Sequence, residues 1–224
     1  MGWNWWPDEI AHGGPEHLDP AYVERFDRKS STDWSATVES LAGLGIGSTS
    51  TVLDIGAGTG TFALAVRPYV GRLVAVDPSP AMVALMRERG VEAVQGGFLS
   101  YEHDGAPVDL VHSRNALHLP DFWKVVALHR AAELLKPDGV FLLTDIVYSF
   151  RPEEANTVIE RWLGDAVTDS LLGWTPAELA EHVRTENSTF SWLLEPILDR
   201  VGFEVTERSY SESRLHASYV CRRS

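Results

Sequence analysis

The chain has 224 residues, of which 44% are hydrophobic, and a formal net charge of −13. This length can bury one full core with an added cap, and no apolar run approaches the roughly 18 residues that a membrane-spanning helix requires. Nucleic-acid binding depends on Lys and Arg at phosphates, and the compact basic clusters are no longer than pairs such as Arg222 and Arg223, so we expect neither DNA nor RNA as a partner.

The start of the chain has no basic segment followed by an apolar core, so we expect no secretory signal. The single cysteine, Cys221, has no cysteine partner for a disulfide, which agrees with a reducing compartment. We therefore expect a cytoplasmic protein, either a monomer or a homodimer, with no membrane partner.

Residues 1–50 precede the first expected strand and contain two amphipathic helical patterns. Asp19 and Pro20 are typical of a helix start, where the acid caps free N–H groups and proline occupies the first turn. A second helix is expected over residues 34–43, with Ala42 among its inward-facing side chains.

Three tryptophans, Trp3, Trp5 and Trp6, stand beside a proline near the start of the chain. This density of aromatic side chains is atypical of a disordered tail. They either close over a pocket or pin the N-terminus to the surface of the domain, and the residues alone leave both interpretations open.

Residues 51–60 read Thr-Val-Leu-Asp-Ile-Gly-Ala-Gly-Thr-Gly, which predicts a buried strand, a glycine loop and the start of a helix. Glycine lets a ligand approach the backbone, and the first helical N–H groups point toward the loop. A dinucleotide fingerprint would need a third glycine where Thr61 stands, so the spacing disfavours a nicotinamide cofactor. The alternative is a turn that holds no ligand.

The second strand is expected over residues 72–76 and leads into Asp77, about 20 residues after the glycine loop, where a βαβ unit returns to the same sheet edge. A carboxylate there can accept both hydroxyls of a ribose. The following helix begins at Ser79 and Pro80 and carries Met82. Without a ligand, Asp77 would be an ordinary helix cap and Met82 ordinary core.

Further strands are expected over residues 91–95, 109–112 and 140–147, with a helix over 121–135 and a turn over 136–139. This alternation of strands and helices predicts a parallel, doubly wound sheet.

Residues 148–200 interrupt the alternation with helical signals. Pro152 opens one helix, and a capping box from Thr175 to Glu178 opens another. Two alternating segments, residues 203–210 and 215–221, then predict a pair of final strands that close the sheet.

Four motifs in this order resemble those of class I S-adenosylmethionine-dependent methyltransferases. They are Asp-x-Gly-x-Gly-x-Gly from Asp54, Val-Asp-Pro-Ser-Pro-Ala-Met around Asp77, Asn-Ala-Leu-His-Leu-Pro from Asn115, and Leu-Lys-Pro-Asp-Gly-Val-Phe-Leu-Leu from Leu135. The string that begins at His182 resembles a group of bacterial small-molecule methyltransferases. The resemblance implies an α/β fold with a doubly wound, seven-stranded, mostly parallel Rossmann-like sheet and a helical cap.

The resemblance implies S-adenosyl-L-methionine as the cofactor. In such proteins the second acid binds ribose, nearby apolar residues pack on adenine, and the loop after the fourth strand holds the methionine end. The chain departs from the family where an acid or amide usually holds the adenine amino group, because Gly97 and Phe98 stand there. The cofactor-binding residues implied in this way are Asp54, Gly56, Ala57, Gly58, Asp77, Pro78, Met82, Gly97, Phe98 and Asn115.

Methyl transfer from a sulfonium needs alignment, exclusion of water and removal of a proton from a protonated acceptor, but no covalent intermediate. His118 is the best candidate for the base, since an imidazole exchanges protons near neutral pH. Glu186 is the second catalytic candidate. The alternatives are a structural histidine and a solvated acid at a helix end.

We expect no metal, because the remaining histidines lack zinc-like spacing. These are His12, His17, His103, His112, His129, His182 and His216.

By resemblance, residues 1–50 form an N-terminal helical lid, 51–147 the cofactor-binding core, 148–200 a helical cap, and 201–224 the final two strands. Lid and cap together would enclose a small, partly aromatic methyl acceptor. The substrate-binding candidates are Trp3, Trp6, Tyr22, Tyr148 and Trp174, of which the last two are alternatively cap core.

The function expected from these features is methyl transfer to an O, N or C nucleophile of a small molecule, in secondary metabolism. One alternative is a protein of this fold that binds the cofactor in a regulatory or non-methylating role. Another is a nicotinamide-dependent oxidoreductase.

Overall fold

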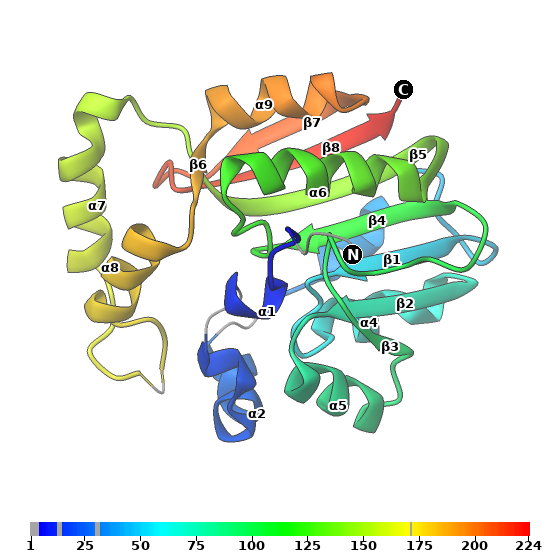
Figure 1. Ribbon diagram of the computed structural model, residues 1–224, viewed down its shortest axis with the longest axis horizontal. Helices are drawn as coiled ribbons and strands as arrows, with labels where there is room; N and C mark the ends of the chain where they lie inside the picture. The colour runs from blue at the N-terminus through cyan, green and yellow to red at the C-terminus, as the bar shows by residue number, and fades with distance from the viewer. Residues whose placement is uncertain (1–4, 13–14, 30–31, 171) are drawn as a thin grey trace.

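The computed structural model describes residues 5–12, 15–29, 32–170 and 172–224. Its centre is one mixed sheet with the strand order β3-β2-β1-β4-β5-β8-β7 (Figure 1). The first five strands are parallel, whereas β8 is antiparallel to both β5 and β7. The predicted fold class is therefore confirmed. The strands on this path are β1 Thr51–Ile55, β2 Arg72–Asp77, β3 Ala93–Gln95, β4 Val108–Arg114, β5 Leu135–Tyr148, β7 Phe203–Tyr210 and β8 His216–Arg223.

The central strands are apolar on both faces, and successive side chains enter different layers of the core. In β1, Leu53 and Ile55 belong to one buried cluster and Val52 to the other. This follows from the alternation of side chains along a strand. The run of apolar residues in β1 therefore matches a strand that is covered by helices on both sides.

Helices cover both faces of this sheet. The cluster that contains Leu53 also contains residues of α6 (Asp121–Leu134) and α9 (Ser191–Arg200). The cluster that contains Val52 includes residues of α4 (Thr61–Val66) and α5 (Pro80–Glu88). The short helix α3 (Ser35–Ser40) and the turn after it lie on this second face, through Val38 and Leu41.

Three local features differ from the sequence-based expectations. Helix α3 ends at Ser40 rather than in the region of residue 43, and Ala42 is exposed rather than inward-facing. Strand β5 begins before the predicted turn, because Leu135 pairs with Val108 ahead of a register shift. The turn geometry survives inside this strand as a left-handed Asp138, with a φ of 60°.

Helix α9 was not predicted, and it lies in the segment that was expected to form only the cap. Leu194 and Leu198 are completely buried against the sheet. The end of that segment thus belongs to the helical layer of the core. A two-residue strand, β6 (Thr189–Phe190), precedes α9 and pairs with the end of β5.

The remaining helices lie beyond the carboxyl ends of the parallel strands (Figure 1). Between β5 and β6 are η3 (Pro152–Glu154), α7 (Ala155–Gly164) and α8 (Pro176–Thr185). The start of α8 and its capping box agree with the prediction. The N-terminal segment contributes α1 (Glu9–His12), η1 (Pro15–Leu18) and α2 (Pro20–Lys29). A further short helix, η2 (Arg67–Tyr69), is not part of this group; it follows α4 and precedes the start of β2. Among the described residues, no helix has both the length and the apolar character needed to cross a bilayer.

Candidate active site

A cavity of about 850 Å³ lies beyond the ends of β1, β2 and β4, under the N-terminal segment and α8. Open α/β sheets bind their ligands at this edge. All ten residues predicted to bind the cofactor line this cavity, as do the two catalytic candidates His118 and Glu186. Whether they perform those roles remains a prediction.

The glycine loop is folded back onto β2, because the N–H groups of Gly56 and Ala57 both donate to the carbonyl of Val76, at 2.8 and 3.0 Å. Gly56, Gly58 and Gly60 all have left-handed φ angles, of 75°, 56° and 80°. Such angles suit glycine, which has no Cβ to clash with the carbonyl. The loop conformation is thus set by three alternate glycines.

Only one of these glycines faces open space. A Cβ at Gly56 would lie 2.1 Å from Cβ of Ala116, and one at Gly60 would lie 2.9 Å from the side chain of Met86. A Cβ at Gly58 would instead meet nothing closer than Phe26, at 3.9 Å. Gly56 and Gly60 are therefore needed for packing, whereas the position of Gly58 leaves room for a ligand.

Asp77 ends β2 opposite this loop. Its Oδ2 accepts a hydrogen bond from the N–H of Gly58 at 2.8 Å, and its Oδ1 accepts one from the N–H of Ser79 at 2.9 Å. Burial raises the pKa of Asp77 to about 7; the two hydrogen bonds oppose this shift, and the charge of Asp54 adds to it. The carboxyl group thus exchanges its proton in the physiological range.

Asp54 is the second buried acid, with 1% of its surface exposed. Its Oδ1 lies 2.7 Å from Nδ1 of His112, whose ring stacks on Phe62 with centroids 3.7 Å apart. Its Oδ2 is buried and has no hydrogen-bond partner among the described residues. Because an unsatisfied buried acceptor is destabilising, this oxygen is suited to receive a donor from a ligand in the cavity.

The turn after β3 holds an acid that the local sequence lacks. Glu9 of α1 reaches the turn, where Oε1 accepts from the N–H of Leu99 and Oε2 from the N–H of Ser100, each at 2.8 Å. A Cβ at Gly97 would lie 2.5 Å from Oε1 of Glu9. Gly97 therefore makes space for a carboxylate that comes from the N-terminal segment, a contact that the sequence analysis missed.

The loop after β4 is positioned by β5. The N–H of Asn115, which has a φ of 50°, donates to the carbonyl of Thr144 at 2.9 Å. The buried Asp145 accepts from the N–H groups of Ala116 and Leu117 at 3.2 and 2.9 Å. These bonds hold the loop that carries His118.

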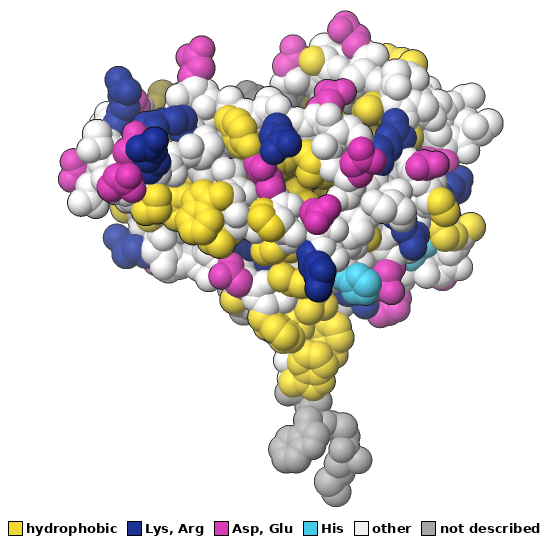
Figure 2. All heavy atoms as spheres, turned by 90° about the horizontal axis from the view of Figure 1, so that it is seen from above, with side chains coloured by type: hydrophobic (Ala, Val, Ile, Leu, Met, Phe, Trp, Pro, Cys, Tyr) yellow, Lys and Arg dark blue, Asp and Glu magenta, His cyan; other side chains and the backbone are white. Residues whose placement is uncertain are grey.

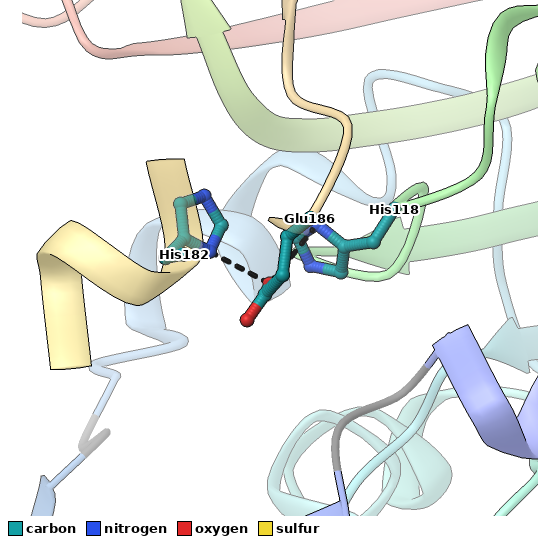
Figure 3. Close-up of side chains that lie close together, drawn as sticks. All are labelled: His118, His182 and Glu186. Carbon is teal, nitrogen blue, oxygen red and sulfur yellow. Dashed lines mark ion pairs between the residues drawn. The ribbon is translucent and has the colours of Figure 1, made fainter. Parts of the chain in front are cut away.

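His118 meets two residues of α8 and its C-terminal cap in the cavity (Figure 3). Nδ1 of His118 lies 3.5 Å from Oε2 of Glu186, and Nδ1 of His182 lies 2.7 Å from the same oxygen. Burial acts to raise the pKa of Glu186, but its hydrogen bond with His182 and the charges of nearby histidines outweigh this effect and lower it. The structure thus brings both catalytic candidates together and adds His182.

The sequence analysis missed His182 as a member of this group. The available signal was its i,i+4 spacing to Glu186, which places two side chains on one helix face. The expectation of no metal rested on spacing along the chain, and that argument fails here, because His118 joins the pair from a distant loop.

Contacts behind these side chains restrict their positions. Nε2 of His118 lies 2.7 Å from the carbonyl of Asn115, and Nε2 of His182 lies 2.9 Å from the hydroxyl of Ser188. The buried Lys124 donates from Nζ to the carbonyl of Asn187 at 2.7 Å. Burial lowers the pKa of Lys124, while Asp145 and Asp121 act to raise it.

The N-terminal segment is attached on both sides of the cavity. Nζ of Lys29 forms an ion pair with Glu178 of α8 at 2.5 Å and lies 4.8 Å from the ring centroid of Trp174. On the other side, the hydroxyl of Ser79 donates to the carbonyl of His17 at 2.6 Å. The segment therefore connects α5 with α8 across the cavity.

The five substrate-binding candidates fall into three groups. Tyr22 and Trp174 line the cavity, whereas Trp3 lies outside the described residues. Trp6 and Tyr148 do not line the cavity, so the structure adds no support to their predicted role in substrate binding.

Trp6 packs in a tilted arrangement against Trp5 and Trp123 of α6, at centroid distances of 5.2 and 5.5 Å. Trp5 and Trp6 are 58% and 44% exposed, and Figure 2 shows hydrophobic side chains gathered in a projection on one face. Tyr148 is buried with Phe150 and Phe190 under the helices of the cap. Trp6 and Tyr148 thus both pack against neighbouring aromatic rings rather than facing the cavity.

Comparison with known proteins identifies a match to the family model described as a methyltransferase domain, over residues 52–139. The chain is 40% identical over 111 residues to an uncharacterized methyltransferase, YcgJ, of Bacillus subtilis, which covers 46% of this chain and 42% of that protein. It is 33% identical over 143 residues to the cypemycin N-terminal methyltransferase of a Streptomyces species, covering 58% of this chain and 56% of the relative. The chain thus spans about half the length of these curated relatives.

Among solved structures, the [4+2]-cyclase SpnF is similar to this chain, with a TM-score of 0.68 over 96% of both chains. Its sequence identity is 15%, so this likeness concerns the fold.

Proposed function

We propose that this chain, which belongs to the class I S-adenosylmethionine-dependent methyltransferases, transfers a methyl group from S-adenosyl-L-methionine to an O, N or C nucleophile of a small molecule. The single observation that carries this proposal is the composition of the cavity. One end, which we call the cofactor end, has the glycine loop and the buried carboxylates of Asp54 and Asp77. The other end, which we call the acceptor end, has His118, His182 and Glu186.

Two features of the first end fit the cofactor. Oδ2 of Asp54 is a buried acceptor that would receive a hydrogen bond from the cofactor's amino group, and Gly58 leaves the space that a Cβ would fill. Asp77 would accept the ribose hydroxyls. Pro78, Met82, Gly97 and Phe98 would surround the adenine, and Asn115 would contact the methionine end.

When bound, the cofactor supplies an electrophilic methyl group, and the residues at the other end act on the acceptor. A carbonyl can only accept a hydrogen bond, so the 2.7 Å contact with Asn115 requires a proton on Nε2 of His118. In the neutral ring, Nδ1 then carries the free lone pair, and it would take the acceptor's proton. Glu186 would stabilise the imidazolium that forms.

The helical segments would exclude water from this reaction. We propose residues 1–50 as the lid and residues 148–200, apart from the core helix α9 at their end, as the cap over the 51–147 core, with 201–224 completing the sheet. Lys29 and Glu178 support the proposal, because they join the two segments across the cavity. A cavity of about 850 Å³ favours a compact acceptor over a polymer.

Calorimetric titration with S-adenosylmethionine, its demethylated product and NAD tests the cofactor, and we expect binding of the first two only. Incubation with labelled methyl donor and an extract of the source organism, followed by isolation of the labelled product, tests the acceptor. Cofactor binding without any labelled small molecule would contradict the methyl-transfer proposal. NAD binding would favour the oxidoreductase alternative.

A second candidate is a non-methylating or regulatory role that uses the same fold and cofactor. This candidate is supported by the similarity in fold to a [4+2]-cyclase over nearly the whole chain, because that protein's name shows that the fold also serves a reaction other than methyl transfer. Secondary metabolism as the setting is supported by the likeness to the cypemycin N-terminal methyltransferase. We further propose a cytoplasmic monomer or homodimer without nucleic-acid partners, in keeping with the net charge of −13.

A further inference from the structure

We propose that His118, His182 and Glu186 bind one divalent transition-metal ion, of which Zn²⁺ is the best match, at the acceptor end of the cavity (Figure 3). The three side chains each offer one ligand atom, and these atoms lie within 4.8 Å of one another. Two imidazole nitrogens with one carboxylate oxygen are a common donor set for catalytic zinc.

The spacing of the ligand atoms is close to what a metal needs. Zinc bonds to nitrogen and oxygen of about 2.0–2.2 Å place tetrahedral ligands roughly 3.4 Å apart. Oε2 of Glu186 lies 3.5 Å from Nδ1 of His118 and 2.7 Å from Nδ1 of His182. The two histidine ligand atoms lie within 4.8 Å of each other, so forming the site requires the shorter contact to open and the two imidazoles to approach to about 3.4 Å.

The hydrogen bonds behind the histidines prepare the same nitrogens for a metal. The carbonyl of Asn115 requires a proton on Nε2 of His118, which leaves the lone pair of Nδ1 directed toward Glu186. That Nδ1 is buried and has no hydrogen-bond partner among the described residues. Nε2 of His182 lies against the hydroxyl of Ser188, which can accept a proton from Nε2 when Nδ1 exchanges its hydrogen bond with Glu186 for a bond to the ion. Metal-binding histidines usually have such a partner for the nitrogen that faces away from the ion.

The three ligands come from two segments that are fixed to the core. Asp145 holds the loop of His118 through the N–H groups of Ala116 and Leu117, and Lys124 holds the carbonyl of Asn187, the residue after Glu186. Rigid supports lower the entropy that is lost when an ion orders its ligands. The geometry in Figure 3 is thus maintained by bonds outside the cluster.

Three protein ligands leave a fourth position of a tetrahedral ion, and all three line the cavity. Two neutral imidazoles and one carboxylate around a divalent ion give a net charge of +1, which favours an oxygen anion as the fourth ligand. A hydroxyl-bearing acceptor bound there would lose its proton more readily. Metal binding itself does not depend on the proposed methyl transfer. Where both hold, the ion takes over from His118 the activation of the acceptor.

The chain contains a matched control for this site. His129 and Glu133 have the same i,i+4 spacing on α6, at a contact distance of 3.6 Å. Their side chains are 59% and 62% exposed, and no third ligand is grouped with them in the described part of the chain. A surface histidine–glutamate pair of equal spacing should therefore bind metal only weakly.

The experiment uses the full chain without an affinity tag, after treatment with a chelator. Zn²⁺ is titrated by calorimetry and Co²⁺ by visible absorption, and melting temperature is followed with and without Zn²⁺. The variants are Glu186→Gln, His182→Asn and His118→Asn, with His129→Asn as the control. Circular dichroism confirms that each variant is folded.

We expect one equivalent of Zn²⁺ per chain, an intense tetrahedral Co²⁺ spectrum and a higher melting temperature. Each ligand variant should lose at least about 100-fold in affinity, since even outer partners of metal ligands contribute about 10- to 100-fold. His129→Asn should bind as the unmodified protein does. Absence of saturable binding at stoichiometric concentrations, or binding that Glu186→Gln and His182→Asn leave unchanged, would overturn the site. If Zn²⁺ does not bind, the titration with S-adenosylmethionine can still show cofactor binding. The metal site and the proposed function can therefore be refuted independently of each other.

Discussion

The two ends of the cavity, the proposed cofactor end around the glycine loop and the proposed acceptor end around His118, are built in different ways. The cofactor end is formed by the residues that directly follow β1, β2 and β3, and backbone N–H groups provide much of its surface, as between Gly58 and Asp77. The acceptor end is formed by side chains from segments far apart in the chain, such as His118 and His182. A site made of backbone requires particular residues in one short motif, whereas a site made of side chains requires only that distant segments meet.

Their electrostatics differ as well. The cofactor end has two buried acids, Asp54 and Asp77, which suit a ligand with a positive charge and hydroxyl groups. At the acceptor end, histidines surround Glu186, and His216 also lines the cavity. Burial lowers the pKa of His216, and the charge of Arg114 adds to this effect. One end is thus suited to binding a cation, and the other to moving a proton.

The largest effect is expected from Gly58→Val, which should abolish cofactor binding because the branched side chain enters the open space of the loop. The left-handed φ adds strain on the order of 1–2 kcal/mol. Gly45→Val is the matched control, since Gly45 has a φ of 83° and no atom within 4 Å of the added Cβ. Calorimetry should show lost binding only for Gly58→Val. Equal affinity in both variants would mean that the loop is only a turn.

His118→Asn tests the other end of the cavity. We expect methyl transfer to fall by about 10²–10⁴-fold, the usual contribution of a general base, with cofactor affinity unchanged. Single-turnover rates with labelled donor, alongside cofactor titration, measure the two quantities separately. A parallel fall in cofactor affinity would show that the two ends are not independent.

Asp77→Asn should weaken cofactor binding by about 1.5–3 kcal/mol, the range for hydrogen bonds to a charged group. Because the ionised carboxylate is the better acceptor and the pKa of Asp77 is about 7, affinity should rise as pH increases through neutrality. The variant should lack this rise. Calorimetric titrations between pH 5.5 and 8.5, roughly one and a half units either side of that pKa, would reveal it. An unchanged profile in the variant would assign the dependence to another group.

The same group should affect the stability of the cofactor-free protein. Its pKa is raised from 3.8 to about 7, so the native state retains a proton that the unfolded chain releases. The stabilisation is fully present below about pH 4 and is lost as pH rises through about 7. Denaturant unfolding of Asp77→Asn should show a smaller decline over this interval. An identical decline in both proteins would contradict the raised pKa.

The smallest effect is expected at the ion pair that joins the N-terminal segment to α8. Lys29→Met removes an ion pair with Glu178 whose side chains are 8% and 34% exposed, and should lower stability by about 1 kcal/mol. Arg72→Met removes a more exposed pair with Glu92, 49% and 50% exposed, and should have less effect. Melting curves compare the two. A larger loss of stability for Arg72→Met would show that the Lys29–Glu178 ion pair does little to hold the N-terminal segment against α8.

Several elements were predictable because their causes are local. The strand, glycine loop and helix over residues 51–66 follow from buried β-branched residues and from glycine's tolerance of left-handed angles. The bounds of α8 follow from the capping box of Thr175 and Glu178. Helix α9 was missed even though its Leu194 and Leu198 have helical spacing, because Pro196 lies inside it and proline is atypical of a helix interior.

Other contacts depend on how segments pack against one another. Glu9 supplies a carboxylate to the turn at Gly97, and no local pattern in either segment indicates it. Trp6 was predicted to line the cavity because it is aromatic. In the structure its ring packs against Trp123 of α6 instead. Aromatic packing is weakly directional, so residue type alone does not decide between two surfaces.

By itself, the sequence determined the order of the main strands, the sheet edge at which the cavity opens, and the residues that line the proposed cofactor end. These depend on backbone angles, strand burial and the return of parallel strands to one edge, all of which act over short stretches. Only the tertiary structure decided that His118, His182 and Glu186 would meet and that Trp6 and Tyr148 would not line the cavity. The reason is physical: their positions depend on buried contacts between remote segments, such as that of Lys124 with Asn187, which no local pattern specifies.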